Sequence, residues 1–243
     1  MSSPARIVVA MSGGVDSSVA AALLVEAGYD VIGLSMQVYD QEHGEHRFGT
    51  CCTLDDLHDA RRVAHVLHIP HYIVNLEQAF EETVVANFVR EYASGRTPIP
   101  CAHCNRELKF ATLVDRAHGL RADAVATGHY ARIETDDQGL RHLLRGVDPT
   151  KDQGYFLFGL TQAQLACAQF PVGALRKSDV RRMAESRGLP VADKPDSQEI
   201  CFVPDGDYAA FVERRLPGRP GGLMMDLEGR VVGRHGGVHR FTI

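Results

Sequence analysis

The residues best suited to chemistry near the start of the chain form a short loop rich in glycine and hydroxyl groups. Ser12–Ser18 reads SGGVDSS and directly follows the apolar run Arg6–Met11. Two adjacent glycines let the backbone turn sharply and approach a ligand closely, and consecutive amide N–H groups at a helix start attract anions. The hydroxyl groups of Ser12, Ser17 and Ser18 add hydrogen-bond donors. The loop therefore predicts a phosphate-binding site.

A carboxylate inside such a loop needs a positively charged neighbour. Asp16 would repel phosphate unless a cation stood between them, so the loop also predicts Mg²⁺. The alternative is an ordinary Gly-Gly turn with Ser and Asp caps, and the whole seven-residue string between an expected strand and helix argues against it. The chain contains neither GxxxxGK[ST] nor GxGxxG, which excludes a Walker loop and a dinucleotide fingerprint.

Three cysteines form the second group of reactive side chains. Cys101 and Cys104 are spaced as C-x-x-C after Pro98 and Pro100, and Cys201 lies far along the chain. Thiolates are nucleophiles, sulfur carriers and metal ligands. A sulfur relay, an iron–sulfur cluster, a redox dithiol, a zinc site and unrelated buried thiols are the alternatives. The two prolines favour a rigid, exposed loop for the C-x-x-C pair.

The position of Cys104 gives it a further property. It stands just before the helical pattern of residues 107–118, whose dipole would lower the pKa of the thiol. In the segment 43–52, His43 and His46 are interpreted as solvated, and Cys51 and Cys52 as packing at a helix entry.

Three other positions each allow a functional and a structural interpretation. Met36 ends the second expected strand, where it contacts either adenine or the core. His129 follows a strand end at Gly128 and serves either a site or a cap. The charged string Lys151–Gln153 indicates a solvated helix start if only its charge pattern is considered.

The composition is ordinary for a globular protein. The 243 residues are 44% hydrophobic and 23% charged, and no apolar run approaches the ~18 residues that a membrane span needs. The net charge of −5 excludes nucleic-acid binding by bulk electrostatics. An RNA would have to meet a local basic patch, such as Arg176–Lys177 with Arg181–Arg182. Six cysteines without a secretion signal predict a reducing compartment, the cytoplasm.

The elements that position these residues alternate between strand and helix patterns. Strands are expected at 6–11, 30–36, 71–75 and 123–127, and helices at 16–27, at 77–93, at 107–118 and after a capping box at Thr53. Strands separated by helices pair in parallel through right-handed crossovers. Residues 1 to about 135 are therefore predicted to form an α/β fold with a doubly wound parallel sheet.

The second half of the chain has a different pattern. A hairpin is expected between 131–133 and 143–144, around a turn at 136–139. Residues 150–190 look helical. After residue 205, the Gly/Pro cluster at 217–222 and short strand-like pieces predict a β-rich unit.

Several strings together resemble a known family. Ser12–Ser18 resembles the PP-loop of the N-type ATP pyrophosphatases, which cleave ATP between the α and β phosphates and adenylate a carbonyl-like oxygen. Further matching strings lie at 97–110, 126–132, 144–148, 151–157, 196–202, 233–237 and 241–243. In order along the chain they resemble the bacterial tRNA-specific 2-thiouridylases. The resemblance implies that ATP adenylates the C2 oxygen of the wobble uridine in tRNA, and that sulfur then displaces AMP.

The same resemblance implies roles for individual residues. Cys104 stands where the family has its nucleophile, and Cys201 where it has the cysteine that carries a persulfide. ATP and Mg²⁺ would be bound around the loop, by Ala10, Met11, Ser12, Gly13, Gly14, Val15, Asp16, Ser17, Met36 and Gly128. Contacts to tRNA would come from Ile99, Pro100, Cys101, His129, Lys151, Asp152 and Gln153. The expected partners are tRNA and a sulfur-donor relay protein, without a membrane, and the expected state is a monomer or weak dimer.

One position departs from the family pattern. The best-known members have Asp three positions before the nucleophile, and this chain has Cys101 there. The proposed base role of that Asp therefore does not carry over. Cys101, Cys104 and Cys201 would suit a 4Fe–4S cluster with one open coordination position, as in related cluster-dependent tRNA thiolases. Persulfide and cluster chemistry are both open at this point.

The resemblance also implies a domain organisation. Residues 1–205 would form the PP-loop catalytic domain and 206–243 the start of a central β-rich domain, with the rest of that domain and a C-terminal β-barrel missing. Two other functions compete. One is a PP-loop ligase acting on a small molecule, which would not need the thiols. The other is a non-catalytic cluster-binding module, which would not need the intact loop.

Overall fold

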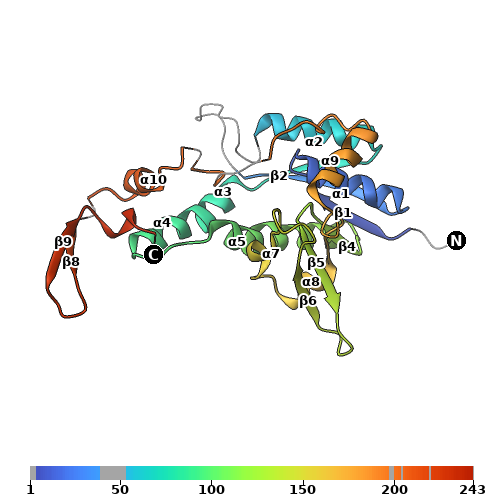
Figure 1. Ribbon diagram of the computed structural model, residues 1–243. Helices are drawn as coiled ribbons and strands as arrows, with labels where there is room; N and C mark the ends of the chain where they lie inside the picture. The colour runs from blue at the N-terminus through green and yellow to red at the C-terminus, as the bar shows by residue number, and fades with distance from the viewer. Residues whose placement is uncertain (1–3, 39–52, 197–199, 204, 219, 243) are drawn as a thin grey trace.

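Five parallel strands form the centre of the molecule. The computed structural model describes residues 4–38, 53–196, 200–203, 205–218 and 220–242. Its main sheet has the order β3–β2–β1–β4–β7 (Figure 1), and each neighbouring pair is parallel. The strands are β1 (Arg6–Ala10), β2 (Asp30–Gln37), β3 (His71–Asn75), β4 (Ala124–Ala126) and β7 (Ala168–Gln169). The predicted α/β fold with a doubly wound parallel sheet is confirmed.

The strand side chains alternate between two buried cores. On β1, Val8 joins one core, while Ile7 and Val9 join the other, and all three are at most 1% exposed. Strands buried on both faces show continuous apolar runs instead of alternation, which explains why their positions are readable in the sequence. The edge strand β7 lies within residues 150–190, which are predicted to be helical. The sequence does not reveal this strand, because two residues are too few to show a period.

Helices cover both faces of the sheet (Figure 1). The Ile7 and Val9 face is covered by α1 (Val15–Glu26), α2 (Leu54–Val66) and α9 (Lys177–Ser186). The opposite face is covered by two helical stretches, α3 (Glu77–Phe80) with η1 (Glu81–Val85) and α4 (Ala86–Ala93), and α5 (Pro100–Cys104) with η2 (Asn105–Phe110) and α6 (Ala111–Gly119). The capping box that opens α2 is confirmed, because Thr53 and Asp56 bond each other's backbone N–H reciprocally.

A hairpin and two short helices lie between the sheet strands β4 and β7 in sequence. The strands β5 (Ala131–Thr135) and β6 (Arg141–Arg145) pair antiparallel, with Ile133 opposite Leu143, which confirms the predicted hairpin. The helices α7 (Gly154–Leu157) and α8 (Gln162–Cys167) lie between this hairpin and β7 in sequence.

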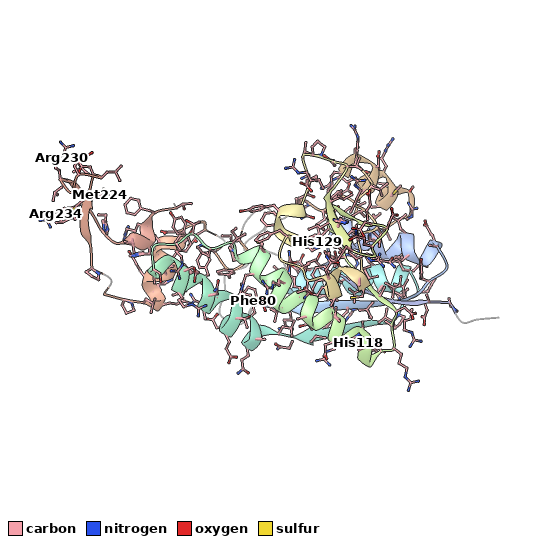
Figure 2. All side chains as sticks on the ribbon, turned by 90° about the horizontal axis from the view of Figure 1, so that it is seen from below. Phe80, His118, His129, Met224, Arg230 and Arg234 are labelled. Carbon is pink, nitrogen blue, oxygen red and sulfur yellow. The ribbon has the colours of Figure 1, made fainter. Side chains whose placement is uncertain are left out.

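The last part of the chain projects away from the sheet. It comprises α10 (Tyr208–Arg215), the antiparallel strands β8 (Gly222–Met225) and β9 (Val231–His235), and η3 (Val238–Arg240). Phe211 of α10 packs on Phe88 and Phe202. Figure 2 shows Met224, Arg230 and Arg234 on the hairpin, far from His129. Among the described helices, none combines the length and apolar character needed to cross a membrane.

Candidate active site

The site lies where the strand order of the sheet reverses. The chain runs from β1 outward to β2 and β3, then returns to β4 on the other side of β1. Open α/β sheets bind ligands at the carboxyl ends of the strands at this point. The loop Ser12–Ser18 follows β1, and Gly128 follows β4. A Cβ on Gly128 would lie 2.5 Å from the Ser17 amide nitrogen, so only glycine permits this close approach of the two segments.

Glycine is also required inside the loop. Gly13 has φ +73°, and a Cβ there would lie 2.1 Å from the carbonyl oxygen of Asp56, at the start of α2. Gly14 is the extended N-cap residue of α1. The amide groups of the first turn of α1 therefore follow a sharp bend directly after the buried strand, as the phosphate-loop prediction requires.

The serine hydroxyls of the loop have different roles. Ser17 Oγ accepts a hydrogen bond from the Ser12 amide at 3.2 Å, donates to the Gly14 carbonyl at 3.1 Å and lies 3.3 Å from Ser12 Oγ. Ser18 is fully buried, and its Oγ donates to the Gly14 carbonyl at 2.8 Å. The expectation that Ser18 offers its hydroxyl to a ligand is therefore wrong, because that hydroxyl is used inside α1.

The cation that meets Asp16 is a lysine from α9. Lys177 Nζ lies 2.7 and 2.8 Å from the two carboxylate oxygens of Asp16 and 2.8 Å from Asp196. Tyr130 donates its hydroxyl to Asp16 at 2.8 Å, and burial, followed by the Asp16 charge, raises the pKa of Tyr130. Sequence reasoning missed this role of Lys177, because its partner is 161 positions away and no local pattern marks the pair.

The carboxylate of Asp16 is the candidate protein ligand for Mg²⁺ at the loop. Mg²⁺ in phosphate sites is commonly bound by one or two carboxylates together with phosphate oxygens and waters. Asp16 supplies one carboxylate beside the loop, and Mg²⁺ would share this carboxylate with the ammonium group of Lys177. In the described part of the chain, no three His, Cys, Asp or Glu side chains are placed to bind a metal by themselves.

Asp196 links the phosphate loop to the string at 151–153. Its carboxylate accepts from Lys151 at 2.7 Å and Arg181 at 2.8 Å, in addition to Lys177. Partial burial favours the neutral acid, but hydrogen bonds from Lys151 and Lys177 lower the pKa of Asp196 to about 2. The expected basic patch at 176–182 is thus not a continuous exposed surface, because Lys177 and Arg181 point into this ion network.

A second lysine fixes the back of the phosphate loop. Lys194 Nζ donates to the Gly13 carbonyl at 3.1 Å, to Asp56 at 2.6 Å and to Asp59 at 2.7 Å. Despite partial burial, hydrogen bonds to the two carboxylates raise the pKa of Lys194. Lys194 thus attaches its segment to the loop and to α2, while Asp196 attaches it to Lys151 and to α9.

The strings at 128–130 and 151–153 are joined directly. The Tyr130 amide donates to Gln153 Oε1 at 3.0 Å, and the Gln153 amide donates to the Tyr130 carbonyl at 2.9 Å. Asp152 accepts from the amides of Gly146 and Gly154. The charges of the string are therefore used within the protein, which corrects its interpretation as a merely solvated helix start.

His129 is a neutral base in this position. Its Nδ1 lies 2.7 Å from Thr127 Oγ1. Burial, with a smaller contribution from the charge of Lys109, lowers the pKa of His129 to about 3. The imidazole can therefore exchange hydrogen bonds at neutral pH without carrying charge.

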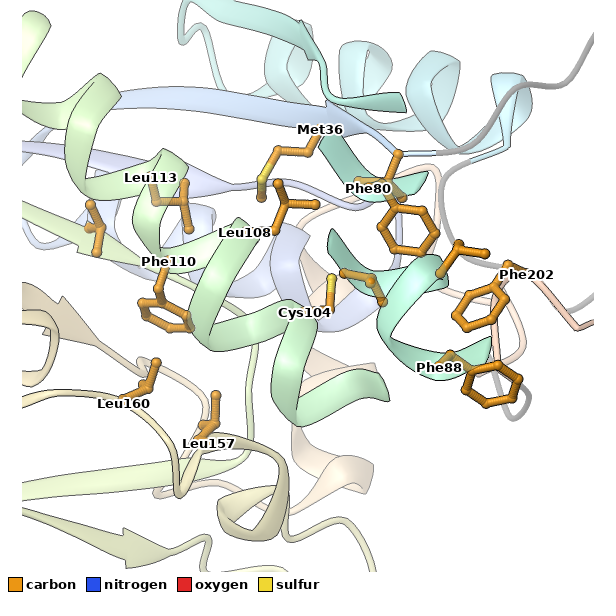
Figure 3. Close-up of a cluster of buried hydrophobic side chains, with 14 of the residues drawn as sticks. Met36, Phe80, Phe88, Cys104, Leu108, Phe110, Leu113, Leu157, Leu160 and Phe202 are labelled. Atoms are coloured by element: carbon orange, nitrogen blue, oxygen red, sulfur yellow. The ribbon is translucent and has the colours of Figure 1, made fainter. Parts of the chain in front are cut away.

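Cys101 and Cys104 lie on a helix that begins earlier than predicted. Pro100 is its first residue, a position where proline is favoured, so Cys101 and Cys104 lie in α5 and not in a loop before a helix. Cys101 is exposed, whereas Cys104 is 6% exposed within the apolar cluster shown in Figure 3. The half-buried Cys201 packs against the same cluster. Next to it, Phe202 contacts Phe80 and Phe88.

The three cysteines do not form a metal-binding group. Cys101, Cys104 and Cys201 are all within the described residues, and no metal-holding set of three side chains is found there. The arrangement brings Cys104 and Cys201 to one cluster and leaves Cys101 at the surface, contrary to the expectation that it lies within ligand reach of both. This side-chain arrangement does not fit a 4Fe–4S cluster.

The remaining predicted site residues lie around these groups. Met36 is 8% exposed in the same cluster as Cys104 (Figure 3), Met11 is buried, and Ile99 is the N-cap of α5. Cys51, Cys52, His43, His46 and residues 197–199 lie outside the described residues. A separate groove of about 710 Å³ lies beside the β5–β6 hairpin, and none of the predicted site residues lines it.

Fold and site together define a doubly wound α/β domain with the PP-loop type of fold, in which a glycine-rich loop follows the first strand. The backbone is similar to that of NMN synthetase from Francisella tularensis, with a TM-score of 0.51 at 20% identity, covering 79% of this chain and 66% of that one. It is also similar to a 4-thiouridine synthetase from an RNA complex with bound ATP, with a TM-score of 0.54 at 17% identity, covering 88% and 50%. At these identities the likeness shows the fold alone.

The sequence gives the family. The tRNA methyl transferase HUP domain family matches residues 5–205, and the chain belongs to this family. It is 56% identical to the tRNA-specific 2-thiouridylase MnmA of Geotalea uraniireducens and 57% identical to that of Geobacter metallireducens, over 98% of this chain. The chain spans 65% and 66% of those relatives, slightly less than two thirds of their length. The resemblance stated from the motifs is confirmed.

Proposed function

We propose that this chain carries the ATP-binding and catalytic part of an enzyme that thiolates uridine in tRNA at C2. The observation that carries the proposal is the connection of the phosphate loop to the other motifs. Asp16 is linked through Lys177 and Asp196 to Lys151, and Tyr130 bonds both Asp16 and Gln153. The high identity to named 2-thiouridylases supports the same function.

The loop suits the first half of the reaction. The C2 oxygen of uridine attacks the α-phosphorus of ATP, the bond between the α and β phosphates breaks, and pyrophosphate leaves. The amides at the start of α1 bind phosphate oxygens, and Lys177, which is bonded to Asp16 in the loop, would offset part of their charge. Mg²⁺ bound between Asp16 and the phosphates would neutralise further charge.

The cysteines suit the second half of the reaction. The terminal sulfur of a persulfide on Cys201 attacks C2, and AMP leaves. The Cys104 thiolate then attacks the Cys201 sulfur, which breaks the sulfur–sulfur bond, releases 2-thiouridine and leaves a disulfide for an external thiol to reduce. The shared apolar cluster of Cys104 and Cys201 supports this relay over a cluster mechanism. A sulfur-donor protein would load the persulfide.

The test separates adenylation from sulfur transfer. With unmodified tRNA, ATP and a persulfide donor, the chain should form AMP only when tRNA is present. Cys104→Ser and Cys201→Ser should lose thiolation, and the matched control Cys167→Ser in α8 should retain it. Full thiolation by either of the first two variants would contradict the relay, and AMP formation without any need for tRNA would favour a small-molecule ligase.

The role of Cys101 is tested separately. Cys101→Ala should keep most of its thiolation, with no iron in the anaerobically purified protein. A loss of about 10²–10⁴-fold without any bound iron in wild type would instead assign the thiol a general-base role. Loss of bound iron and of thiolation together would instead support the cluster mechanism.

A further inference from the structure

Three aromatic rings form an exposed surface on and after α7. Tyr155, Phe156 and Phe158 are 61%, 36% and 64% exposed, whereas Leu157 between them is 1% exposed. The ring centre of Tyr155 lies 5.7 Å from that of Phe156 and 6.0 Å from that of Phe158. We call these three residues the aromatic patch. Adjacent exposed rings of this kind are uncommon on surfaces that contact only water.

The aromatic patch is held beside the candidate site. Asn105, which directly follows Cys104, is 3% exposed and donates its side-chain amide to the Phe156 carbonyl at 3.0 Å. At the other end of α7, Gln153 is bonded to Tyr130. The patch is therefore fixed between the cysteine helix and the segment that contacts the phosphate loop, and α7 lies next to α5 in Figure 1.

Two arginines flank the aromatic patch. A Cβ on Gly159, next to Phe158, would lie 3.2 Å from Arg106 Cδ, and one on Gly154, next to Tyr155, would lie 3.9 Å from Arg145 Cα. Their side chains are 54% and 90% exposed. Each is near an acid, Glu107 at 3.0 Å and Asp152 at 3.8 Å. Such exposed ion pairs contribute little, so phosphate groups can compete for both guanidinium groups.

Aromatic faces beside exposed arginines match the chemistry of an unpaired nucleotide. Bases stack on aromatic rings, and guanidinium groups bind the adjoining phosphates. In a duplex the base faces are already covered by neighbouring bases, so only a single-stranded loop or a flipped base can use the rings. A polyanion also complements the charge of the two arginines, whereas an apolar protein surface would add no counter-charge to the weak pairs with Glu107 and Asp152.

We propose that the aromatic patch stacks an unpaired base of the substrate RNA close to the uridine that is thiolated, with Arg106 and Arg145 binding the flanking phosphates. This inference rests on the proposed function, because it takes RNA as the substrate. It adds residues that select a single-stranded loop over a duplex. The rings recognise any base by its face, so the patch would set where the RNA loop binds and not which base is chosen.

The experiment compares RNA shapes and variants. The affinity of the chain for an anticodon stem-loop and for a fully paired duplex of the same length would be measured for wild type, Tyr155→Ala and Phe158→Ala. Each variant should weaken stem-loop binding roughly 5- to 150-fold and leave duplex and ATP binding unchanged. Tyr155→Phe should bind like wild type, and so should Tyr72→Ala, a matched control at an exposed tyrosine on β3.

A spectroscopic readout distinguishes stacking from a structural role. With 2-aminopurine placed at each loop position in turn, one position should lose fluorescence on binding wild type and recover it with Tyr155→Ala. Unchanged stem-loop affinity in both alanine variants would overturn this proposal while leaving the proposed function intact. Equal weakening of stem-loop, duplex and ATP binding, or a dimer that dissociates in Tyr155→Ala with RNA affinity unchanged, would also overturn it. If wild type bound no RNA at all, the proposed function would fail first.

Discussion

The main sheet and the β8–β9 hairpin contain similar apolar residues that differ in burial. The carboxyl ends of the sheet strands hold the candidate site. Val8 and Val9 on β1 are 0% exposed, whereas Val231 and Val232 on β9 are 58% and 65% exposed. The sheet is covered by helices on both faces, while β8 and β9 pair only with each other among the described strands. A two-stranded hairpin is marginally stable by itself.

Charged groups show the same contrast. At the site, Lys177 is 9% exposed and contacts both Asp16 and Asp196. On the hairpin, Arg230 pairs with Asp226 at 2.7 Å, but its side chain is 75% exposed. Ion pairs of nearly equal length therefore contribute differently to the free energy of unfolding. Removing one partner lowers stability strongly only where water cannot replace the lost charge. The comparison predicts that matched substitutions will have unequal effects in the two regions.

The largest difference is expected for two glycines that share a left-handed conformation. Gly13 has φ +73° and Gly229 has φ +82°, but a Cβ on Gly13 would meet the Asp56 carbonyl at 2.1 Å, and one on Gly229 would meet nothing within 4 Å. Gly229→Ala should lower the free energy of unfolding by about 1–2 kcal/mol. Gly13→Ala should lower it by about 2–5 kcal/mol because crowding is added, and it should also abolish ATP binding. Urea unfolding and nucleotide titration would measure both, and equal effects would contradict the close approach at Gly13.

The next difference concerns the two ion pairs. Lys177→Met should lower the free energy of unfolding by about 2–4 kcal/mol, since it leaves Asp16 and Asp196 without their shared cation. It should also strongly reduce tRNA-dependent AMP formation. Arg230→Met on the hairpin should cost less than about 1 kcal/mol and leave AMP formation unchanged. A small effect of Lys177→Met on both readouts would show that water substitutes for the ammonium group.

The third difference is a pH dependence. The pKa of Asp196 is about 2 in the folded protein, below its usual value of 3.8. Because the folded pKa is lowered, the stabilisation is present above pH 3.8 and is lost as the pH falls toward 2. Between pH 5 and pH 2.5, wild type should lose roughly 1–2 kcal/mol more unfolding free energy than Asp196→Asn. Asp226→Asn on the hairpin should show a smaller change, because its partner Arg230 is 75% exposed and water can replace the guanidinium group. Identical pH profiles of wild type and Asp196→Asn would contradict the ion network.

The sequence predicts the sheet better than the contacts made across it. Strands such as β1 are apolar throughout because both faces are buried, and Gly13 and Gly14 indicate a sharp backbone turn through their type alone. The close approach of Gly128 to Ser17 is found only in the structure. The ion network of Lys177 is not readable, because its members come together only when α9 packs against α1. The start of α5 at Pro100 was available as a signal, since proline is favoured at the first helical position, but the burial of Cys104 depends on distant aromatic residues.

The smallest expected effect is that of a substitution at Val232, and it tests whether another surface covers the hairpin in solution. Val9→Thr should cost roughly 1–3 kcal/mol, because the added hydroxyl would be buried in the core without an assured partner, whereas Val232→Thr should change the free energy of unfolding by less than about 0.5 kcal/mol. The difference follows from exposures of 0% and 65% at residues of the same type. Thermal or urea unfolding of both variants would measure it. A cost above about 1 kcal/mol for Val232→Thr, the size of a buried-site substitution, would mean that this apolar face is covered in solution, since an exposed threonine on a strand loses almost nothing relative to valine.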